Sequence, residues 1–177
     1  MGVLTALALA VALSACGGSS SSSDVTPAAY VKSICQAIVP FEKNVQNRRS
    51  QLDLSSITSP AQGKQALQGF LAGVVGDAQK AVTQLKNAGT PKVNNGKKIS
   101  DAIVGAFTQA QTALSQAKDK AASLPTGSAQ AFKTGAQSLG TGILSSMNNI
   151  GTSLGNLKSP ELEQAAKKEP ACNSVSG

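Results

Sequence analysis

The chain has 177 residues, which suits one domain with short appendages, and it contains no histidine and no tryptophan. The missing histidine excludes Ser-His-Asp and Cys-His catalysis, HExxH zinc sites and the Glu-x-x-His di-iron site of helical bundles. The net charge is +7, charged residues make up only 14% and aromatic residues only 3%, so the aromatic platforms that stack nucleic-acid bases are nearly absent and we expect no nucleic-acid partner.

The first element is an apolar run over residues 3–13, VLTALALAVAL. It has the length of a signal-peptide core and is too short to span a bilayer. No Lys or Arg precedes it, so we expect the natural signal to begin upstream of Met1. An alternative is a buried first helix followed by an ordinary cysteine.

The run ends in Leu13-Ser14-Ala15-Cys16, which resembles the lipobox of bacterial lipoproteins. In that family a peptidase cuts directly before the cysteine, whose thiol carries a diacylglycerol. The resemblance implies that residues 1–15 are a signal peptide and that Cys16 is the lipid attachment site. It also implies a protein anchored at the outer, extracytoplasmic face of the cell membrane.

A Gly/Ser-rich segment follows, with Gly17, Gly18 and five serines up to Ser23. Such a segment is a flexible coil that buries no apolar surface. We therefore expect residues 16–25 to be a lipidated tether, residues 26–172 to be the folded domain and residues 173–177 to be a disordered tail.

Two cysteines remain in the domain, Cys35 and Cys172. An even pair in an exported protein predicts a disulfide. A metal pair or a redox pair would be the alternatives, but the chain has neither a histidine nor a CxxC motif.

Five helix starts are predicted by Ser or Thr at an N-cap position, four of them followed by Pro, which has no N–H to leave unpaired. The starts are Thr26-Pro27, Ser59-Pro60, Thr90-Pro91, Ser128 and Ser159-Pro160. Between them, apolar residues recur at alternating spacings of three and four, as in helices that share one core. The pattern predicts an all-α, up-and-down four-helix bundle with a short C-terminal helix, Pro160 to Lys168, tied by the Cys35–Cys172 disulfide.

Several small residues and one proline lie within these helices. Pro40 should kink the first helix, and the fourth helix contains five glycines. The pairs Gly69 with Gly73 and Gly151 with Gly155 suggest close helix contacts. A loose fourth helix that orders on binding a partner is the alternative.

The charged residues show no catalytic arrangement. Most carboxylates are expected on outer helix faces, no two of them form an acid/base pair, and we expect neither a cofactor nor a metal. The basic pairs Arg48-Arg49, Lys97-Lys98 and Lys167-Lys168 lie near the ends of segments. There they either stabilise the helix dipole or contact an anionic lipid or envelope polymer.

The whole pattern resembles the small secreted lipoproteins of actinobacteria. The lipobox, the serine tether, the cysteine early in the first helix and the tail Ser159-Pro160-Glu161-Leu162 with Pro170-Ala171-Cys172 carry this resemblance. It implies a location and no reaction, since members of the group mostly lack an assigned activity.

The sequence is consistent with two functions. The first is a non-enzymatic lipoprotein that binds or scaffolds another component of the envelope, either a protein or an anionic polymer. The alternative is a carrier of a small apolar ligand or lipid, with Phe107, Phe132 and Met147 lining a cavity between the helices rather than filling the core. A large apolar cavity would favour the carrier, and a solid core with an exposed apolar patch would favour the partner-binding protein.

Overall fold

The computed structural model describes residues 23–51, 57–155 and 157–172. The predicted signal peptide, Cys16 and residues 173–177 lie outside these ranges. The elements in chain order are β1 (Asp24–Val25), α1 (Pro27–Ser50), α2 (Pro60–Lys86), β2 (Thr90–Pro91), α3 (Gly96–Ala122), α4 (Ala129–Gly155), α5 (Pro160–Lys168) and a 3₁₀ turn, Pro170–Cys172.

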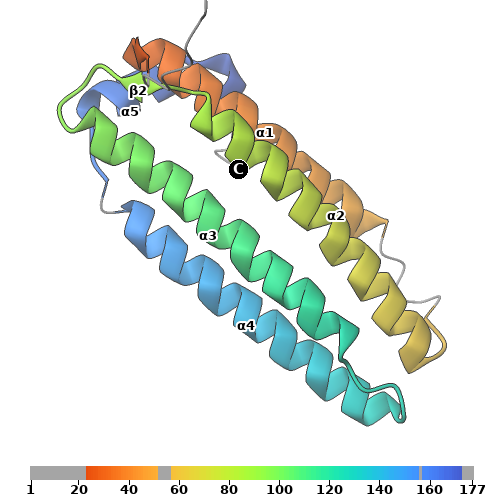
Figure 1. Cartoon of the computed structure of the whole chain (residues 1–177). Helices are drawn as coiled ribbons and strands as arrows, with labels where there is room; N and C mark the ends of the chain where they lie inside the picture. Colours follow the sequence, from red (N-terminus) through yellow and green to blue (C-terminus); the bar gives the residue numbers. More distant parts are fainter. Residues whose placement is uncertain (1–22, 52–56, 156, 173–177) are drawn as a thin grey trace, which may run out of the picture.

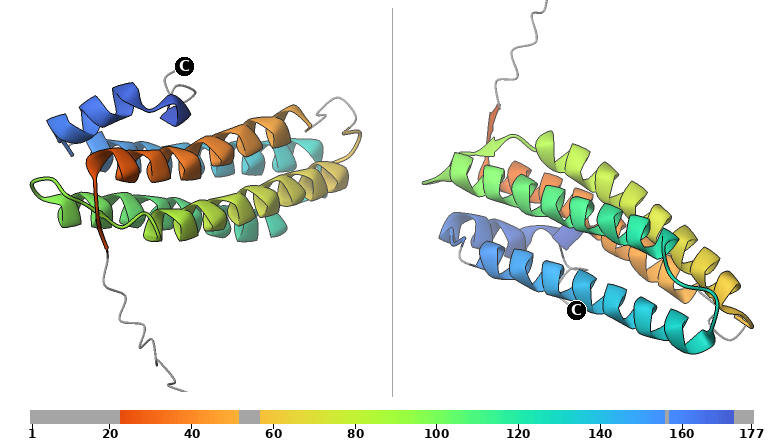
Figure 2. Two further views of the ribbon diagram at one scale, coloured as in Figure 1. Left: turned by 90° about the horizontal axis from the view of Figure 1, so that it is seen from above. Right: turned by 60° about the horizontal axis from the view of Figure 1, so that its bottom comes forward.

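The four long helices run alternately up and down, and α5 lies against α1 at the end of the bundle where β2 is found (Figures 1 and 2). The predicted all-α bundle with a short C-terminal helix and one disulfide is confirmed. No helix of the described ranges has the length and hydrophobicity needed to cross a bilayer.

Four of the five predicted helix starts are found in the structure. The side chains of Thr26, Ser59 and Ser159 each accept a hydrogen bond from the N–H three residues on, with Pro at the first helical position. Ser128 accepts one from Ala131 N–H in the same way. These caps satisfy backbone donors that have no partner within the helix, which is why the local sequence predicts them well.

The predicted start at Thr90-Pro91 is wrong. These residues form β2, which pairs in parallel with β1 in the register Asp24 to Thr90 and Val25 to Pro91. The Thr90 N–H donates to Ser23 O at 3.2 Å and the Lys92 N–H donates to Val25 O at 2.8 Å. Pro91 has no N–H to donate and is tolerated in so short an edge strand. Pairing with a distant segment therefore overrides the helix start that the local sequence predicts.

This strand pairing also moves the end of the predicted tether. Asp24 and Val25 were expected within the flexible segment 16–25, but they belong to the folded domain. Gly89 makes room for them, because its φ of +81° suits glycine and a Cβ at this position would overlap Ser23 O. The chain therefore enters the bundle at the α2–α3 connection.

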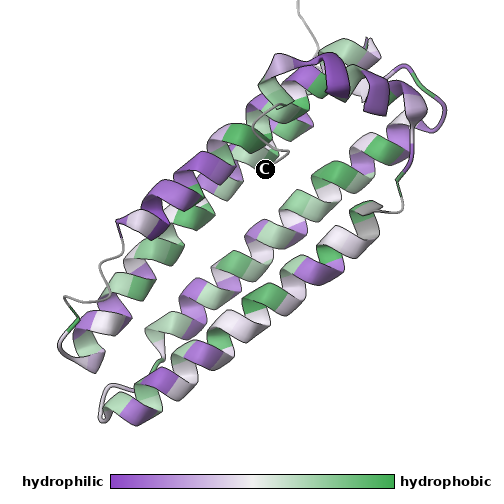
Figure 3. Ribbon diagram, turned by 180° about the vertical axis from the view of Figure 1, so that it is seen from behind, coloured by the Kyte–Doolittle hydropathy of each residue, from purple (hydrophilic) through white to green (hydrophobic). Residues whose placement is uncertain are grey.

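The core lies mainly between α2 and α3. Leu71, Val74 and Leu85 of α2 and Leu114 of α3 are buried. In contrast, most of the large apolar residues of α4 are only half-buried. Hydrophobic and hydrophilic bands alternate along the long helices (Figure 3). Helix packing joins α1 to α2, α2 to α3 and α3 to α4, whereas α1 and α4 make no comparable contact within the described ranges. The bundle is therefore open along one side.

The disulfide fixes the short helix to the first one. Cys35 and Cys172 are bonded across a sequence separation of 137 residues, and both are buried beside Val31 with Leu162 packed against them. Closing a loop of this size lowers the entropy of the unfolded chain, which stabilises the fold by roughly 5 kcal/mol.

An ion pair joins α1 to α2, with Asp77 buried and the Arg48 side chain 40% exposed. The Arg48 Nε donates to the Asp77 Oδ2 at 2.7 Å, and Lys80 lies 3.8 Å from the other carboxylate oxygen. Asp77 is only 4% exposed, so it is an exception to the expectation that most carboxylates lie on outer faces. Gly73 lies one turn before Asp77, and a Cβ there would overlap the Arg48 guanidinium.

The small-residue pairs have a different role from the predicted one. A Cβ at Gly69 or at Gly151 would meet no atom of a neighbouring element, so neither glycine marks a close helix contact. Gly73 admits a side chain, that of Arg48, rather than a helix backbone. The expected glycine-mediated packing is therefore not observed at these positions.

We expect Arg48→Met to lower the free energy of unfolding by about 2 kcal/mol, because it leaves the Asp77 carboxylate buried with only the more distant Lys80 beside it. The neighbouring Arg49 is exposed and provides the matched control. Arg49→Met should change the stability by less than about 0.5 kcal/mol. Urea unfolding of both variants measures the difference, and equal values would contradict the assigned role of the ion pair.

Tyr30 is buried, with 2% of its surface exposed. Burial, and secondly the negative charge of Asp101, raise the pKa of its phenol from 10.0 to about 12. The folded state therefore holds this proton more tightly than the unfolded state does. The resulting stability is complete below pH 10 and is lost as the pH rises through 12.

We expect alkaline titration, followed by tyrosinate absorbance, to give a pKa near 12 for the folded chain and near 10 for the chain in denaturant. Since Tyr30 is the only tyrosine and there is no tryptophan, the signal comes from one group. The free energy of unfolding should fall by roughly 2–3 kcal/mol between pH 10 and 12, and by less in Tyr30→Phe. A folded-state pKa near 10 would contradict the burial of the phenol.

Candidate ligand-binding groove

The open side of the bundle contains an apolar cavity of about 540 Å³ between α1 and α4. α1 contributes Phe41 and Val45, and α4 contributes Ile143 and Met147. Phe70, Leu71 and Val74 of α2 and Leu114 of α3 also line it. Except for Leu71, these residues belong to a cluster centred on the buried Val74, Ala78 and Leu114, so the cavity has the bundle core as its floor.

A second apolar cavity of about 270 Å³ lies on the same side, nearer to α5. Ile34 and Ile38 of α1 face it, and Leu162 of α5 closes its end. The remaining apolar lining is Ile99, Ile103 and Phe107 from α3, with Leu154 of α4 and Leu157 of the α4–α5 connection. α5 therefore bounds the open side at the end where β2 lies.

An aromatic pair lies between the two cavities. Phe41 lines the larger cavity and Phe107 the smaller one, and their rings meet edge to face with centroids 6.3 Å apart. The α1 residues that line the two cavities extend from Ile34 to Gln46, a distance of about 18 Å along the helix axis. We call the two cavities together the α1–α4 groove.

Four polar side chains line the groove among its apolar residues. Glu42 and Gln46 line the larger cavity beside eight apolar residues. Ser159 and Glu163 line the smaller one beside eight apolar residues. Both volumes together are within the range of small-molecule sites, which are mostly apolar with a few polar groups that orient the ligand. The groove can therefore hold an elongated apolar molecule that carries a polar group.

The predicted lining residues have different positions. Phe107 and Met147 line the groove. Phe132 does not, because it packs at the other end of the bundle against the core cluster of Leu71, Leu124 and Leu139. Phe41, Val45 and Phe70 were not predicted as lining residues, although the helical spacing placed Phe41 and Val45 on the inner face of the first helix.

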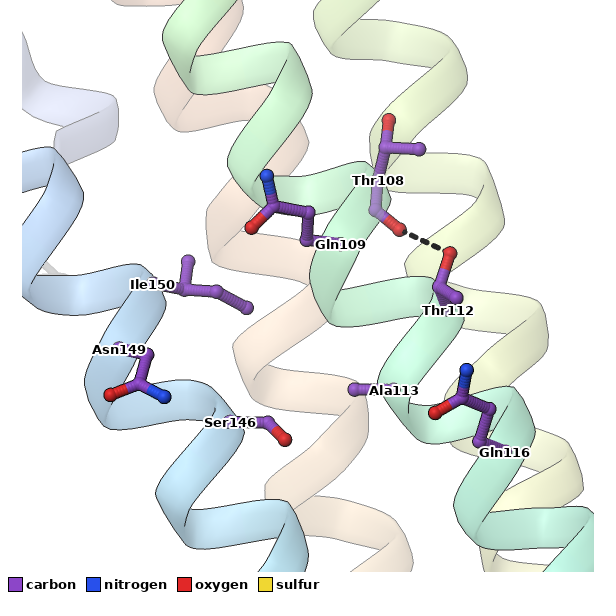
Figure 4. Close-up of a pocket in the computed structure, with 8 residues that line it drawn as sticks. All are labelled: Thr108, Gln109, Thr112, Ala113, Gln116, Ser146, Asn149 and Ile150. Carbon is purple, nitrogen blue, oxygen red and sulfur yellow. Dashed lines mark hydrogen bonds between the residues drawn. The ribbon is translucent and has the colours of Figure 1, made fainter.

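The cleft between α3 and α4 has a different character. Its volume is about 340 Å³, and its lining includes Gln109 and Gln116 of α3 and Ser146 and Asn149 of α4, beside Ile150 (Figure 4). The Thr112 hydroxyl donates to the Thr108 carbonyl at 2.9 Å. Six of the eight residues that line this cleft are polar, so it offers an elongated apolar ligand few apolar side chains to contact.

The described ranges contain no group of three or more His, Cys, Asp or Glu side chains able to hold a metal ion. Comparison with protein-family models, with curated protein sequences and with solved structures gave no match. The site therefore has to be interpreted from its own geometry.

Proposed function

We propose that this chain is a non-enzymatic, lipid-anchored protein of the extracytoplasmic membrane face that binds an elongated apolar ligand, such as an acyl chain, in the α1–α4 groove. The observation that carries the proposal is the apolar cavity of about 540 Å³ between helices that do not close on each other. The proposed location at the membrane rests on the resemblance of Leu13-Ser14-Ala15-Cys16 to a lipobox.

The shape of the groove favours a narrow ligand. The α1 residues of the groove extend over about 18 Å along the helix axis, a length that suits an extended acyl chain. Covering this apolar surface contributes about 25 cal/mol per Å². An acyl chain would lie along the apolar residues of the groove, with its polar end near Glu42 and Gln46 or near Glu163.

The second candidate ligand is another protein. This is the function that the sequence analysis put first. Leu144 of α4 is 62% exposed and is the one large hydrophobic residue of the described ranges with such exposure. Residues 134–157 carry no charged side chain, so the outer face of α4 could accept another protein. Ligand binding in the groove separates the two candidates, since such a partner needs no ligand there.

We expect a fluorescent C18 fatty acid to bind the protein with increased emission, and Met147→Trp to weaken this binding about tenfold or more, equivalent to about 1.4 kcal/mol. The larger indole takes up space in the groove. Ile150→Trp is the matched control, because Ile150 lies one turn further along α4 but lines the polar cleft. It should retain the affinity of the wild type.

The two variants should have the same thermal midpoint as the wild type within a few degrees, which excludes unfolding as the cause. Equal binding by both variants, or no binding by the wild type, would contradict the groove as the ligand site. The second result would favour the protein partner.

Lipidation at Cys16 is tested separately. Expressed in a bacterial host behind a complete signal sequence, the protein should partition into the detergent phase of a Triton X-114 extract, because two or more acyl chains give stable anchoring. Cys16→Ser should move it to the aqueous phase. Cys35→Ser, which removes a domain cysteine, should remain in the detergent phase. Aqueous partitioning of the wild type would contradict the anchor.

A further inference from the structure

The α2–α3 connection is the most basic part of the sequence. Between Asp77 and Asp101 the chain carries five lysines and no acidic residue. Four of them gather where α2 ends and α3 begins, and all four are exposed. We call this surface the basic end, and it consists of Lys86, Lys92, Lys97 and Lys98.

Helix stability does not account for all of these lysines. Stabilising the helix dipole was one of the two roles expected for the pair Lys97-Lys98. The structure places both residues in the first turn of α3. Positive charge is unfavourable there, because a helix N-terminus is itself positive. The turn has no acidic residue, and Asn95 at the N-cap makes no side-chain capping bond.

Neighbouring carboxylates neutralise only part of the positive charge at the basic end. Lys97 pairs with Asp101 at 2.7 Å, with both side chains largely exposed. Lys86, Lys92 and Lys98 have no carboxylate of the described ranges within salt-bridge distance. Asp24 of β1 is held beside this connection through its pairing with Thr90, and Glu163 of α5 lines the same cavity as Ile99 near the start of α3.

The N-terminal entry of the chain lies at this same end. Ser23 O and Val25 O accept hydrogen bonds from Thr90 and Lys92 on the α2–α3 connection. Seven peptide units separate Cys16 from Ser23, which at full extension span at most about 25 Å. A lipid on Cys16 would therefore hold the basic end near the membrane surface, and the opposite end of the bundle far from it.

We propose that the basic end is a docking surface for anionic lipid headgroups, which orients the bundle with the α2–α3 connection toward the membrane. The charge of the four lysines is complementary to such a surface, and the entry point of the chain gives the direction. Each lysine near an anionic bilayer increases partitioning by about fivefold. The inference goes beyond ligand binding in the groove, and it is tested on protein without lipid so that the two proposals fail independently.

The test uses the chain from residue 16 onward with Cys16→Ser, which retains every contact described between residues 23 and 172. It is sedimented with vesicles of phosphatidylcholine and phosphatidylglycerol in a two-to-one ratio, and with vesicles of phosphatidylcholine alone. We expect binding to the anionic vesicles only. This binding should disappear at about 1 M salt, where the Debye length is about 3 Å.

A charge-matched pair of variants locates the surface. Changing Lys86, Lys92, Lys97 and Lys98 to Gln should lower partitioning about 50-fold or more. The control changes four lysines at the opposite end to Gln, with the same loss of charge, and should lower it less than about fivefold. These control positions are Lys64, Lys118, Lys120 and Lys133.

Orientation is measured with a polarity-sensitive fluorophore on Asn94→Cys, at the basic end, and on Thr126→Cys, at the opposite end. Addition of anionic vesicles should shift the emission of the first and leave the second unchanged. An equal loss of binding in the two Gln variants would overturn the proposal in favour of a general attraction by net charge. Failure of the wild type to bind anionic vesicles, or a shift at Thr126→Cys alone, would also overturn it.

Discussion

The covalent bond between Cys35 and Cys172 fixes α5 on α1, and α5 in turn bounds one end of the open side of the bundle. α5 follows α4 after a short connection, so the end of α4 must lie where α5 can reach α1. α5 packs against Val31 and Cys35, and its Leu162 closes the end of the groove. It therefore occupies part of the α1 surface on which a fourth helix could otherwise close. Without the bond, this helix of nine residues would be too short to be stable by itself.

Because the bundle is open between α1 and α4, its apolar residues fall into two groups. Those of α2 and α3 form a dense core, in which alanines such as Ala78, Ala117 and Ala121 allow close approach of the helices. Those of α1 and α4 contact this core from one side only, and they also form the walls of the groove. The Arg48–Asp77 pair helps to hold α1 on α2 despite the missing contact with α4. A narrow apolar ligand would provide the contacts that a closed bundle obtains from its own side chains.

Both ends of the bundle carry several basic side chains, and they differ in their connection to the rest of the chain. The α2–α3 end carries a run of lysines, the entry of the chain at Ser23 and the α5 cover of the groove. At the other end, Phe132 packs against a solid apolar cluster. A protein held by its N-terminal segment would thus present one end to the membrane, with the groove running away from it along the helices. Binding in the groove and orientation by the lysines use separate residues and can be changed separately.

The sequence by itself determined the class of the fold, four of the five helix starts, the C-terminal helix and the disulfide. Thr26, Ser59, Ser128 and Ser159 were predictable because a cap bonds to a donor three residues away, within reach of local reasoning. Cys35 and Cys172 were predictable because they are the only cysteines left once Cys16 is assigned to the lipid. Met147 and Phe107 were also correctly placed on inner faces by the helical period. Only the tertiary structure decided that Thr90-Pro91 is a strand, that Asp77 is buried, that Phe132 belongs to the core and that α1 and α4 enclose a groove. Each of these depends on a contact between segments far apart in the chain, which residue spacing does not encode because every helix has the same period wherever its neighbours lie.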